Sequence, residues 1–401
     1  MKLLVVCSSL DLRVPLSSTP SWWQLLKALA ERGVDLVVAP YQGPSIESPW
    51  WTAAANPCQR EGDAVGWLKR WAPPRTTPAA EAGESVSDRL TRALVDRFTR
   101  PRWQRHLANL LASQRDIDAV VFISVPPNHF IGIPAYLRAR FGVPTYFYDG
   151  DVPASLPSFA GFRTGFKIYQ GADLSEYEAV LSNSSGGLSE LADLGARRVG
   201  VLYYAVDPAL FSPLDLQQDI DVFFYGHGRE YRETWMDAML AEPSRALPQA
   251  RFAVRGTRLG NLGKVEQLPY LSFNRLREYC CRSRINLLIT RQAHASVRGS
   301  STARPFELAA LGCAMVSNPY SGVEEWFEPG REIVVVQNAQ QAVDTYTLLL
   351  GDAAARRELG SRARERVLRE HTYSHRADQL VGFLSGSAAP PPLAATAERS
   401  T

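Results

Sequence analysis

Glu307 lies in a stretch whose residue types favour a short helix with a carboxylate near its start. Pro305 fixes φ at a value suited to the first turn of a helix, and Gly312 is a natural residue just beyond a helix end. The sequence therefore predicts a helix between these two residues, with Glu307 in its first turn.

A turn rich in small residues follows this predicted helix. The apolar segment 313–316 is short enough for a buried parallel strand, and the turn 318–322 is expected to open a second helix at Val323. Unpaired N–H groups at a helix start lie at the positive end of the helix dipole, where an anion is stabilised. A carboxylate and an anion-binding turn on one rim suit a nucleoside diphosphate. The residues predicted to form this rim with Glu307 are Ser321, Gly322 and Glu324.

Arginines follow three predicted strands in the second half of the chain, which are expected at 220–225, 251–254 and 285–290. Ligands of open α/β sheets bind outside the carboxyl ends of the strands. A pyrophosphate group gains charge as the bond to it breaks, and preorganised cations stabilise that charge without a metal. The element formed by Gly226 and Gly228 is shorter than a dinucleotide fingerprint, but it lies at the correct place. The residues assigned to this cationic set are Gly226, His227, Gly228, Arg229, Arg255, Arg291 and Arg304.

Three further polar residues follow strands expected in the first half of the chain. His129 comes after the strand at 118–124, and Asp149 and Asp151 come after the strand at 143–148. We expect all three to face the space between two domains as candidate bases or acceptor ligands. An inverting transfer needs such a base, whereas in a retaining transfer the leaving phosphate can take the proton. The two aspartates also have a spacing that suits a divalent ion, but no other cluster supports a metal and we predict none.

The length and composition describe an ordinary globular protein with two domains. At 401 residues the chain exceeds the size at which one core stops growing. Its 45% hydrophobic and 21% charged content does not fit a disordered or membrane chain, and a net charge of +3 does not predict a nucleic-acid partner. The apolar start is too short for a secretion signal, and five cysteines without a C-x-x-C pair favour a reducing compartment, so we predict a cytoplasmic protein.

Short apolar strands alternate with helical stretches in both halves, which predicts an α/β protein with two doubly wound parallel sheets. We expect a first domain over 1–206 with an insertion at about 40–85, and a second domain over 207–374. A helix at 375–385 is expected to cross back to the first domain, and the Ala/Pro-rich tail 386–401 is expected to be disordered. Trp50 and Trp51 either pack under the insertion or contact an acceptor or a membrane surface.

The stretch 304–325 resembles the signature of the group 1 glycosyltransferases, and the run 327–336 resembles their spore-maturation, CgeB-like branch. Residues 180–213 are similar to the hinge entry of the same superfamily, so the resemblance covers about 175–376. It implies the GT-B architecture, in which two Rossmann-like domains face a central cleft and the C-terminal domain holds the donor. It also implies that Glu307 holds the ribose hydroxyls and that Ser321 and Gly322 hold the phosphates. Many relatives have another glutamate eight residues earlier, where this chain has Gly299.

The resemblance implies transfer of a sugar from a nucleoside-diphosphate sugar, of UDP or GDP type, to a hydroxyl acceptor. The acceptor is a small molecule, a glycan or a lipid-linked molecule, and the expected reaction is retaining and needs neither metal nor cofactor. Two alternatives remain open. One is a nucleotide-sugar epimerase on the same fold. The other is a degenerate nucleotide-sugar-binding or assembly subunit, motivated by Gly299 and by the absence of glycines from the loop 17–21.

Overall fold

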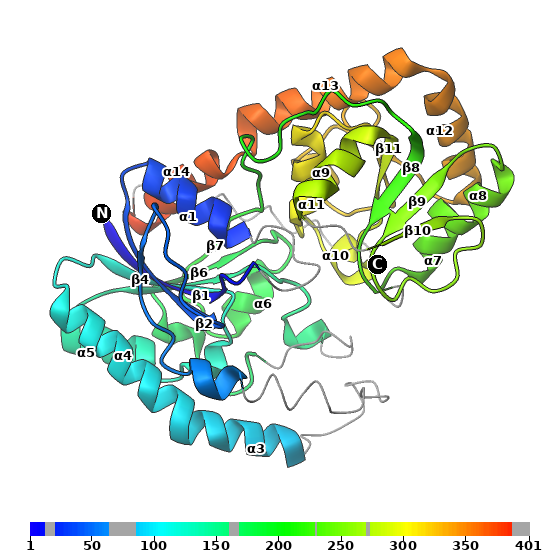
Figure 1. Ribbon diagram of the computed structural model, residues 1–401. Coiled ribbons are helices and arrows are strands. Elements are labelled where there is room, and N and C mark those ends of the chain that lie inside the picture. Colours follow the sequence, from blue (N-terminus) through cyan, green and yellow to red (C-terminus); the bar gives the residue numbers. More distant parts are fainter. Residues whose placement is uncertain (13–20, 64–85, 160–167, 229–230, 270–272, 387–401) are drawn as a thin grey trace, which may run out of the picture.

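The computed structural model describes residues 1–12, 21–63, 86–159, 168–228, 231–269 and 273–386. They form two parallel-stranded α/β units, which Figure 1 shows side by side. The expected α/β class with two doubly wound sheets is therefore confirmed. The tail expected to be disordered lies outside the described residues from 387 onward.

The first sheet has seven parallel strands in the order β3-β2-β1-β4-β5-β6-β7. Strand β1 shows why these segments are strands, because its apolar side chains alternate between two buried faces. Leu3 and Val5 pack with helices α1 and α14, whereas Leu4 and Val6 pack with α4, α5 and α6. The strands are β1 (Lys2–Ser9), β2 (Asp35–Gln42), β3 (Thr52–Ala53), β4 (Ala119–Ile123), β5 (Thr145–Asp149), β6 (Ala179–Ser182) and β7 (Val199–Val201). The helices are α1 (Ser21–Glu31), α3 (Val86–Leu94), α4 (Arg100–Ser113), α5 (Ile133–Phe141), α6 (Leu188–Asp193) and α14 (Tyr373–Leu384).

The second sheet has six parallel strands in the order β10-β9-β8-β11-β12-β13. Helices α7 and α12 share the core on one of its faces, and α9, α11 and α13 share the core on the other. The strands are β8 (Ile220–Tyr225), β9 (Phe252–Arg255), β10 (Glu266–Leu268), β11 (Ser283–Leu288), β12 (Met315–Ser317) and β13 (Val334–Val335). The helices are α7 (Glu233–Met236), α8 (Glu242–Ala246), α9 (Phe273–Arg282), α10 (Gln292–Ser296), α11 (Ala303–Ala310), α12 (Ala339–Gly351) and α13 (Ala353–Glu370).

The structure decides two points in the first unit. The sequence pattern predicts a helix over 85–99 that Pro101 breaks, but helical structure continues from α3 through a π-helical segment, Val95–Thr99, into α4. The proline is accommodated because the π-helical turn before it widens the backbone where its ring replaces an N–H donor. Trp51 is buried and packs edge-on against Trp23 at 4.6 Å, so this side chain belongs to the core.

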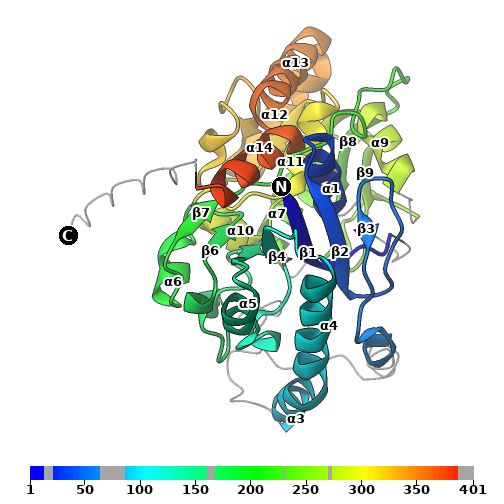
Figure 2. The same ribbon diagram turned by 90° about the vertical axis from the view of Figure 1, so that its left-hand side faces the viewer.

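The chain crosses between the two units twice, and the two crossings pair with each other. Val206 and Thr372 form a parallel bridge, in which the Val206 N–H donates to His371 and the Tyr373 N–H donates to Val206. Helix α14 then packs against α1, as Figures 1 and 2 show, and Arg32 forms an ion pair with Asp378 at 2.8 Å.

The carboxyl end of β6 also contacts the second unit directly. The segment that follows β6 donates from the Gly186 N–H to the Arg298 carbonyl, and Ser184 and Ser300 form an antiparallel bridge. Residues that follow strands of the first sheet therefore meet residues that follow β11 of the second sheet. Among the described residues, no helix combines the length and apolarity that crossing a membrane requires.

Candidate active site

Helix α11 carries Glu307 to the carboxyl end of β8. The helix begins at Ala303, two residues before Pro305, so the expectation that Glu307 lies in the first turn is wrong and the residue lies in the second. Proline is tolerated at the third helical position because the first helical N–H groups have no partner within the helix. Gly312 follows the helix with φ +70°, as expected.

The Glu307 carboxylate is buried and only half satisfied. Its Oε2 accepts a hydrogen bond from the Tyr225 hydroxyl at 2.9 Å, whereas its Oε1 is buried with no hydrogen-bond partner. Burial raises the pKa of Glu307, and the Tyr225 hydrogen bond and the Arg304 charge lower it by less. A buried acceptor without a donor is costly, so this oxygen is suited to a hydroxyl group supplied by a ligand.

Arg304 lies one helical turn before Glu307 and covers the same tyrosine. Its guanidinium stands over the Tyr225 ring at 3.9 Å from the centroid, an arrangement that the ring quadrupole favours. The Nε of Arg304 is buried without a hydrogen-bond partner. A Cβ at Gly226 would lie 2.6 Å from the Phe224 ring and 3.4 Å from Arg304 Nη1. Glycine at this position therefore lets the end of β8 pass close to Arg304.

His227 is a neutral histidine surrounded by arginines. Its Nδ1 accepts the Thr257 N–H at 3.1 Å, so that nitrogen carries no proton. Burial, followed by the charges of nearby arginines, lowers the pKa of His227 to about 4. Cations gathered in this way suit a phosphate group, whose oxygens match the guanidinium fork. The arginines whose charges act on His227 are Arg255, Arg304, Arg232 and Arg258.

The remaining residues of the predicted cationic set lie after β8, at the end of β9 and just before α10. Arg255 ends β9 and is 4% exposed, while Gly228 adopts φ +75° and donates its N–H to the Thr257 carbonyl at 3.1 Å. Arg229 lies outside the described residues, so its role stays a prediction. Arg291 immediately precedes α10, and its guanidinium lies 5.6 Å from the Tyr231 ring centroid.

A polar contact joins the two units near Arg291. Asp151, which follows β5, lies with its Oδ1 3.9 Å from Nε2 of His294 on α10. Burial, followed by the charges of Arg291 and Arg232, lowers the pKa of His294 to about 3, so this contact holds a neutral imidazole at pH 7. The Asp151 side chain is 42% exposed, yet it is recessed among protein atoms. This desolvation, followed by repulsion from Asp149, raises the pKa of Asp151 to about 7.

The side chains of Asp149 and His129 form their hydrogen bonds within the first unit. The Asp149 carboxylate is 1% exposed and accepts from the Ser155 hydroxyl at 2.5 Å, from Tyr169 and from the Asp151 N–H at 2.9 Å. These three donors occupy the carboxylate and fix the loop that presents Asp151. His129 lies in a 3-10 turn, where its Nδ1 pairs with the Tyr41 hydroxyl.

The predicted anion-binding helix at Val323 is wrong. The structure has a single 3-10 turn there, Val323–Glu325, rather than a helix. The Ser321 N–H donates to Ala295 at 2.8 Å and the Val323 N–H donates to Tyr320 at 3.1 Å, so neither amide points outward for an anion. Gly322, at φ +81°, packs so closely that a Cβ would lie 2.3 Å from the Gly299 nitrogen.

Gly299 stands where many relatives of the signature carry a glutamate, and its left-handed backbone is one that other residues adopt only with strain. It adopts φ +56°, and a Cβ there would lie 2.4 Å from the Ser185 hydroxyl and 2.9 Å from Glu325 Oε2. Glu325 accepts from Tyr203 and pairs with Arg298 Nε at 2.9 Å. The predicted residue Glu324 is exposed and pairs with Arg298 Nη1 at 2.9 Å. A network of Arg298 and two carboxylates therefore occupies this part of the rim.

The structure thus brings most of the predicted residues into one connected set. Arg232 lowers the pKa of both His227 and His294, and Ser321 bonds to α10, which carries His294. Sequence reasoning assigned no role to Tyr225, Arg232 or His294. Tyr225 ends a predicted strand and His294 follows another, so their strand-end positions were the available signal.

The described residues contain no group of three or more His, Cys, Asp or Glu side chains that could hold a metal ion. The only pair considered from sequence was Asp149 with Asp151. Because three protein donors occupy the Asp149 carboxylate, this pair does not fit a divalent ion.

Residues 229–382 match the model of a family described as glycosyl transferase-like. No curated protein matches the chain. Among solved structures, sucrose-phosphate synthase from Thermosynechococcus elongatus is 15% identical with a TM-score of 0.66, covering 96% of this chain and 99% of that one. Anabaena HepE in complex with UDP-glucose is 14% identical with a TM-score of 0.59, covering 96% of this chain and 100% of that one. The trehalose-6-phosphate synthase OtsA is 15% identical with a TM-score of 0.61, covering 98% and 100%.

At these identities the structural likeness establishes the fold and not the activity. The match to the family model covers less than half of the chain, and it runs through the part of the second unit that carries Glu307 into α14. This chain therefore has the GT-B fold, and residues 229–382 have the sequence of a glycosyl transferase-like family.

Proposed function

We propose that this protein is a glycosyltransferase that moves a hexose from a UDP-sugar to a hydroxyl acceptor. The observation that carries the proposal is the buried Oε1 of Glu307, which has no donor and belongs to a carboxylate beside Arg304, one of the arginines around His227. A ribose hydroxyl satisfies such an oxygen, and a pyrophosphate satisfies the arginines. The UDP-glucose complex of Anabaena HepE, which shares the fold, favours UDP over other nucleotides.

We assign residues 207–374 to the donor and residues 1–206 to the acceptor, with 375–385 bracing the first domain. We further propose that the protein belongs to the CgeB-like branch, which the run 327–336 resembles. In this assignment Glu307 holds the ribose, while Arg255 and Arg304 face the diphosphate. Because Oε1 is shielded from water, we expect donor binding to move a neighbouring side chain such as Arg304.

The arginine set stabilises the leaving UDP without a metal. As the glycosidic bond breaks, negative charge grows on the β-phosphate, and fixed cations lower the energy of that state. His227 stays neutral at pH 7 because its pKa is about 4, so it offers the phosphate a hydrogen bond rather than a charge. Its Nδ1 is occupied by Thr257, which leaves Nε2–H as the donor.

We propose that transfer occurs with retention, the leaving phosphate taking the acceptor proton. Asp151 and His294 then hold the acceptor hydroxyl at the junction of the two domains, where they lie 3.9 Å apart. Asp149, with its carboxylate fully occupied, positions Asp151. The anomeric configuration of the product, read by NMR, tests retention.

One test of the proposal is UDP binding by isothermal titration calorimetry with Glu307→Ala. Losing a charged acceptor for the ribose hydroxyls is expected to weaken UDP binding by about tenfold or more. Glu328→Ala, an exposed glutamate of the same domain, is the matched control and should bind UDP normally. Equal affinity of the Glu307→Ala variant and the wild type would reject the assignment.

A binding subunit without transfer activity is the second candidate, and Gly299 favours it. A glutamate at this position would be strained, because the backbone there has φ +56°. Release of UDP from UDP-glucose, with water or any offered acceptor, distinguishes the two candidates. A protein that binds UDP-glucose and never releases UDP is the binding subunit.

A further inference from the structure

A pocket lies at the opposite edge of the second sheet, away from the proposed donor site. Its cavity is about 440 Å³ and is bordered by the first residues of β11 and by the turn that leads into β12. This volume lies within the range of small-molecule sites. The six residues of β11 separate its ends by about 17 Å, so a ligand here does not overlap a donor at the carboxyl end.

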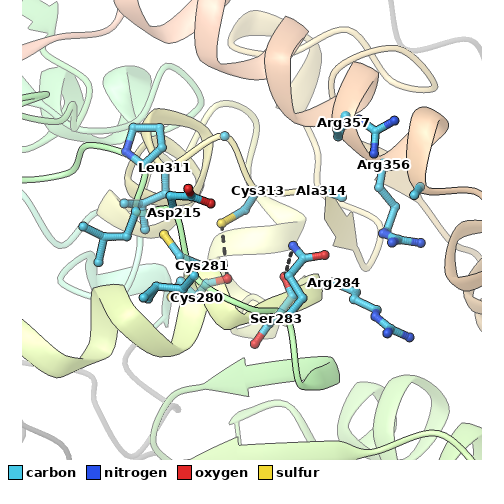
Figure 3. A pocket seen from close by; sticks show the side chains of 16 residues that line it. Asp215, Cys280, Cys281, Ser283, Arg284, Leu311, Cys313, Ala314, Arg356 and Arg357 are labelled. Atoms are coloured by element: carbon cyan, nitrogen blue, oxygen red, sulfur yellow. Dashed lines mark hydrogen bonds between the residues drawn. The ribbon is translucent and has the colours of Figure 1, made fainter.

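The walls of this pocket differ in character, as Figure 3 shows. Arg284, Arg356 and Arg357 come together on one side, from β11 and from the start of α13. Leu311 and Cys281 lie on the other side. Further apolar lining comes from the linker between the two sheets, through Pro213, Leu214 and Leu216.

The basic side carries positive charge that the protein only partly balances. Arg284 pairs with Asp221 at 2.8 Å, and Arg356 donates to the carbonyl groups of Leu349 and Leu350. Arg357 has neither an ion pair nor a hydrogen bond within the described part of the chain.

The three guanidinium groups also repel one another. Burial, followed by the charges of Arg284 and Arg357, lowers the pKa of Arg356, and the opposing effect of Asp221 and Asp352 is smaller. The acid that lines the pocket, Asp215, is exposed and lies on the apolar side in Figure 3. Arginines gathered in this way attract an anion, and their planar fork fits phosphate oxygens.

We propose that this pocket binds a small organic phosphate, with the phosphate on the arginines and an apolar body against the leucines. The proposal does not depend on the function proposed above, because no residue is shared between the two sites.

Helix α11 gives such a ligand a route to the donor site. The helix carries Arg304 and Glu307 near its start, while Leu311 and Gly312 just after its end line the pocket. Helix α13 packs closely against the same turn. A Cβ at Gly360 would lie only 2.0 Å from the Gly312 carbonyl oxygen. A ligand between α13 and the linker therefore contacts elements that also position Glu307.

The test is calorimetric titration of the full-length protein with phenyl phosphate, which combines a dianion with an apolar ring. We expect saturable binding that excess UDP does not displace. Arg357→Gln should weaken it by about tenfold or more, because a charged partner of the phosphate is lost. Arg362→Gln is the control on the same helix, since Arg362 pairs with Glu358 outside the pocket, and it should bind normally.

Each of several results would overturn the proposal. These are the absence of saturable binding at millimolar phenyl phosphate, equal binding by a folded Arg357→Gln variant, and displacement by UDP. Inorganic phosphate that binds as tightly as phenyl phosphate would show that the leucines contribute nothing. A melting curve for Arg357→Gln that matches the wild type establishes that the variant is folded.

Discussion

At the scale of single residues, the environment decides which carboxylates are available for a ligand. Glu307 and Asp149 are both buried, but three protein donors occupy Asp149 whereas one oxygen of Glu307 has none. The first arrangement holds a loop in place, and the second leaves a hydrogen bond for a ligand to complete. Asp151 differs from both, since it is partly exposed and its pKa is about 7.

The pH dependence of activity should follow Asp151. Because its pKa is raised to about 7, the carboxylate that holds the acceptor forms only as the pH rises through that value. UDP release from UDP-glucose should therefore increase with pH and level off above it. Asp151→Asn should be slower by about tenfold at pH 8 and nearly equal to the wild type below pH 6, within the range of effects of one positioned polar group.

The contribution of Asp151 to folding stability changes with pH in the opposite direction to the activity, because it falls as the pH rises. A carboxyl with a raised folded pKa contributes stability below its unfolded value, about 3.9, and loses that contribution as the pH rises through its folded value. The melting temperature of Asp151→Asn should therefore rise relative to that of the wild type as the pH increases from 4 to 8.

If the Asp151→Asn variant keeps the wild-type pH profile of UDP release, Asp151 plays no part in the pH dependence of activity.

The sequence predicted which residues meet at the carboxyl edge of the second sheet better than it predicted their individual hydrogen bonds. Arg255 and Gly226 come together because strand ends of a parallel sheet meet at one edge, and this follows from the alternating pattern, whereas Arg304 approaches Gly226 from α11. The amide of Ser321 was misjudged because its acceptor, Ala295, lies in another element whose placement the local pattern does not encode. The bond between Asp149 and Tyr169 was equally out of reach of local reasoning.

At the scale of elements, α13 packs tightly against the second unit. Its Gly360 packs against the backbone of the turn after α11, where even a methyl group has no space. The sequence pattern predicts a helix at 353–369, but nothing in it indicates this close approach. The break expected at Pro101 failed for a related reason, since a π-helical turn absorbed the proline.

Gly360→Ala should destabilise the protein by about 2 kcal/mol or more, because a Cβ there requires the backbone of the turn to shift. Gly351→Ala, in the last turn of α12, is the matched control. A Cβ at Gly351 meets nothing within 4 Å, so this change should be neutral or stabilising by up to about 1 kcal/mol. Chemical denaturation measures both, and equal free energies of unfolding for the two variants would contradict this packing.

At the scale of the whole molecule, one buried arginine holds the two interdomain crossings together. Arg376 on α14 is 2% exposed and donates to the Tyr203 carbonyl at 2.9 Å in the first crossing. It also donates to the Glu370 carbonyl at 3.3 Å and to His371 Nδ1 at 2.8 Å in the second. Burial lowers the pKa of Arg376 to about 10, and the residue remains charged at neutral pH. Sequence predicted a crossing helix but not this connection.

Arg376→Met should therefore lower the free energy of unfolding by about 3 kcal/mol, since several buried acceptors lose a charged donor. Arg369→Met, an exposed position at the end of α13, should change it by less than about 0.5 kcal/mol. Equilibrium denaturation provides the comparison. A change at Arg376 as small as that at Arg369 would mean that the crossings hold together without it.

The most direct test of the central claim is a double-mutant cycle on the ribose contact. The affinities of UDP and of its 2′,3′-dideoxy analogue are measured by calorimetry for the wild type and for Glu307→Ala. If Glu307 holds the ribose, removing the hydroxyls weakens binding to the wild type by about tenfold or more and leaves binding to the variant unchanged. The same loss in both proteins would contradict the account, because the hydroxyls would then be bound elsewhere.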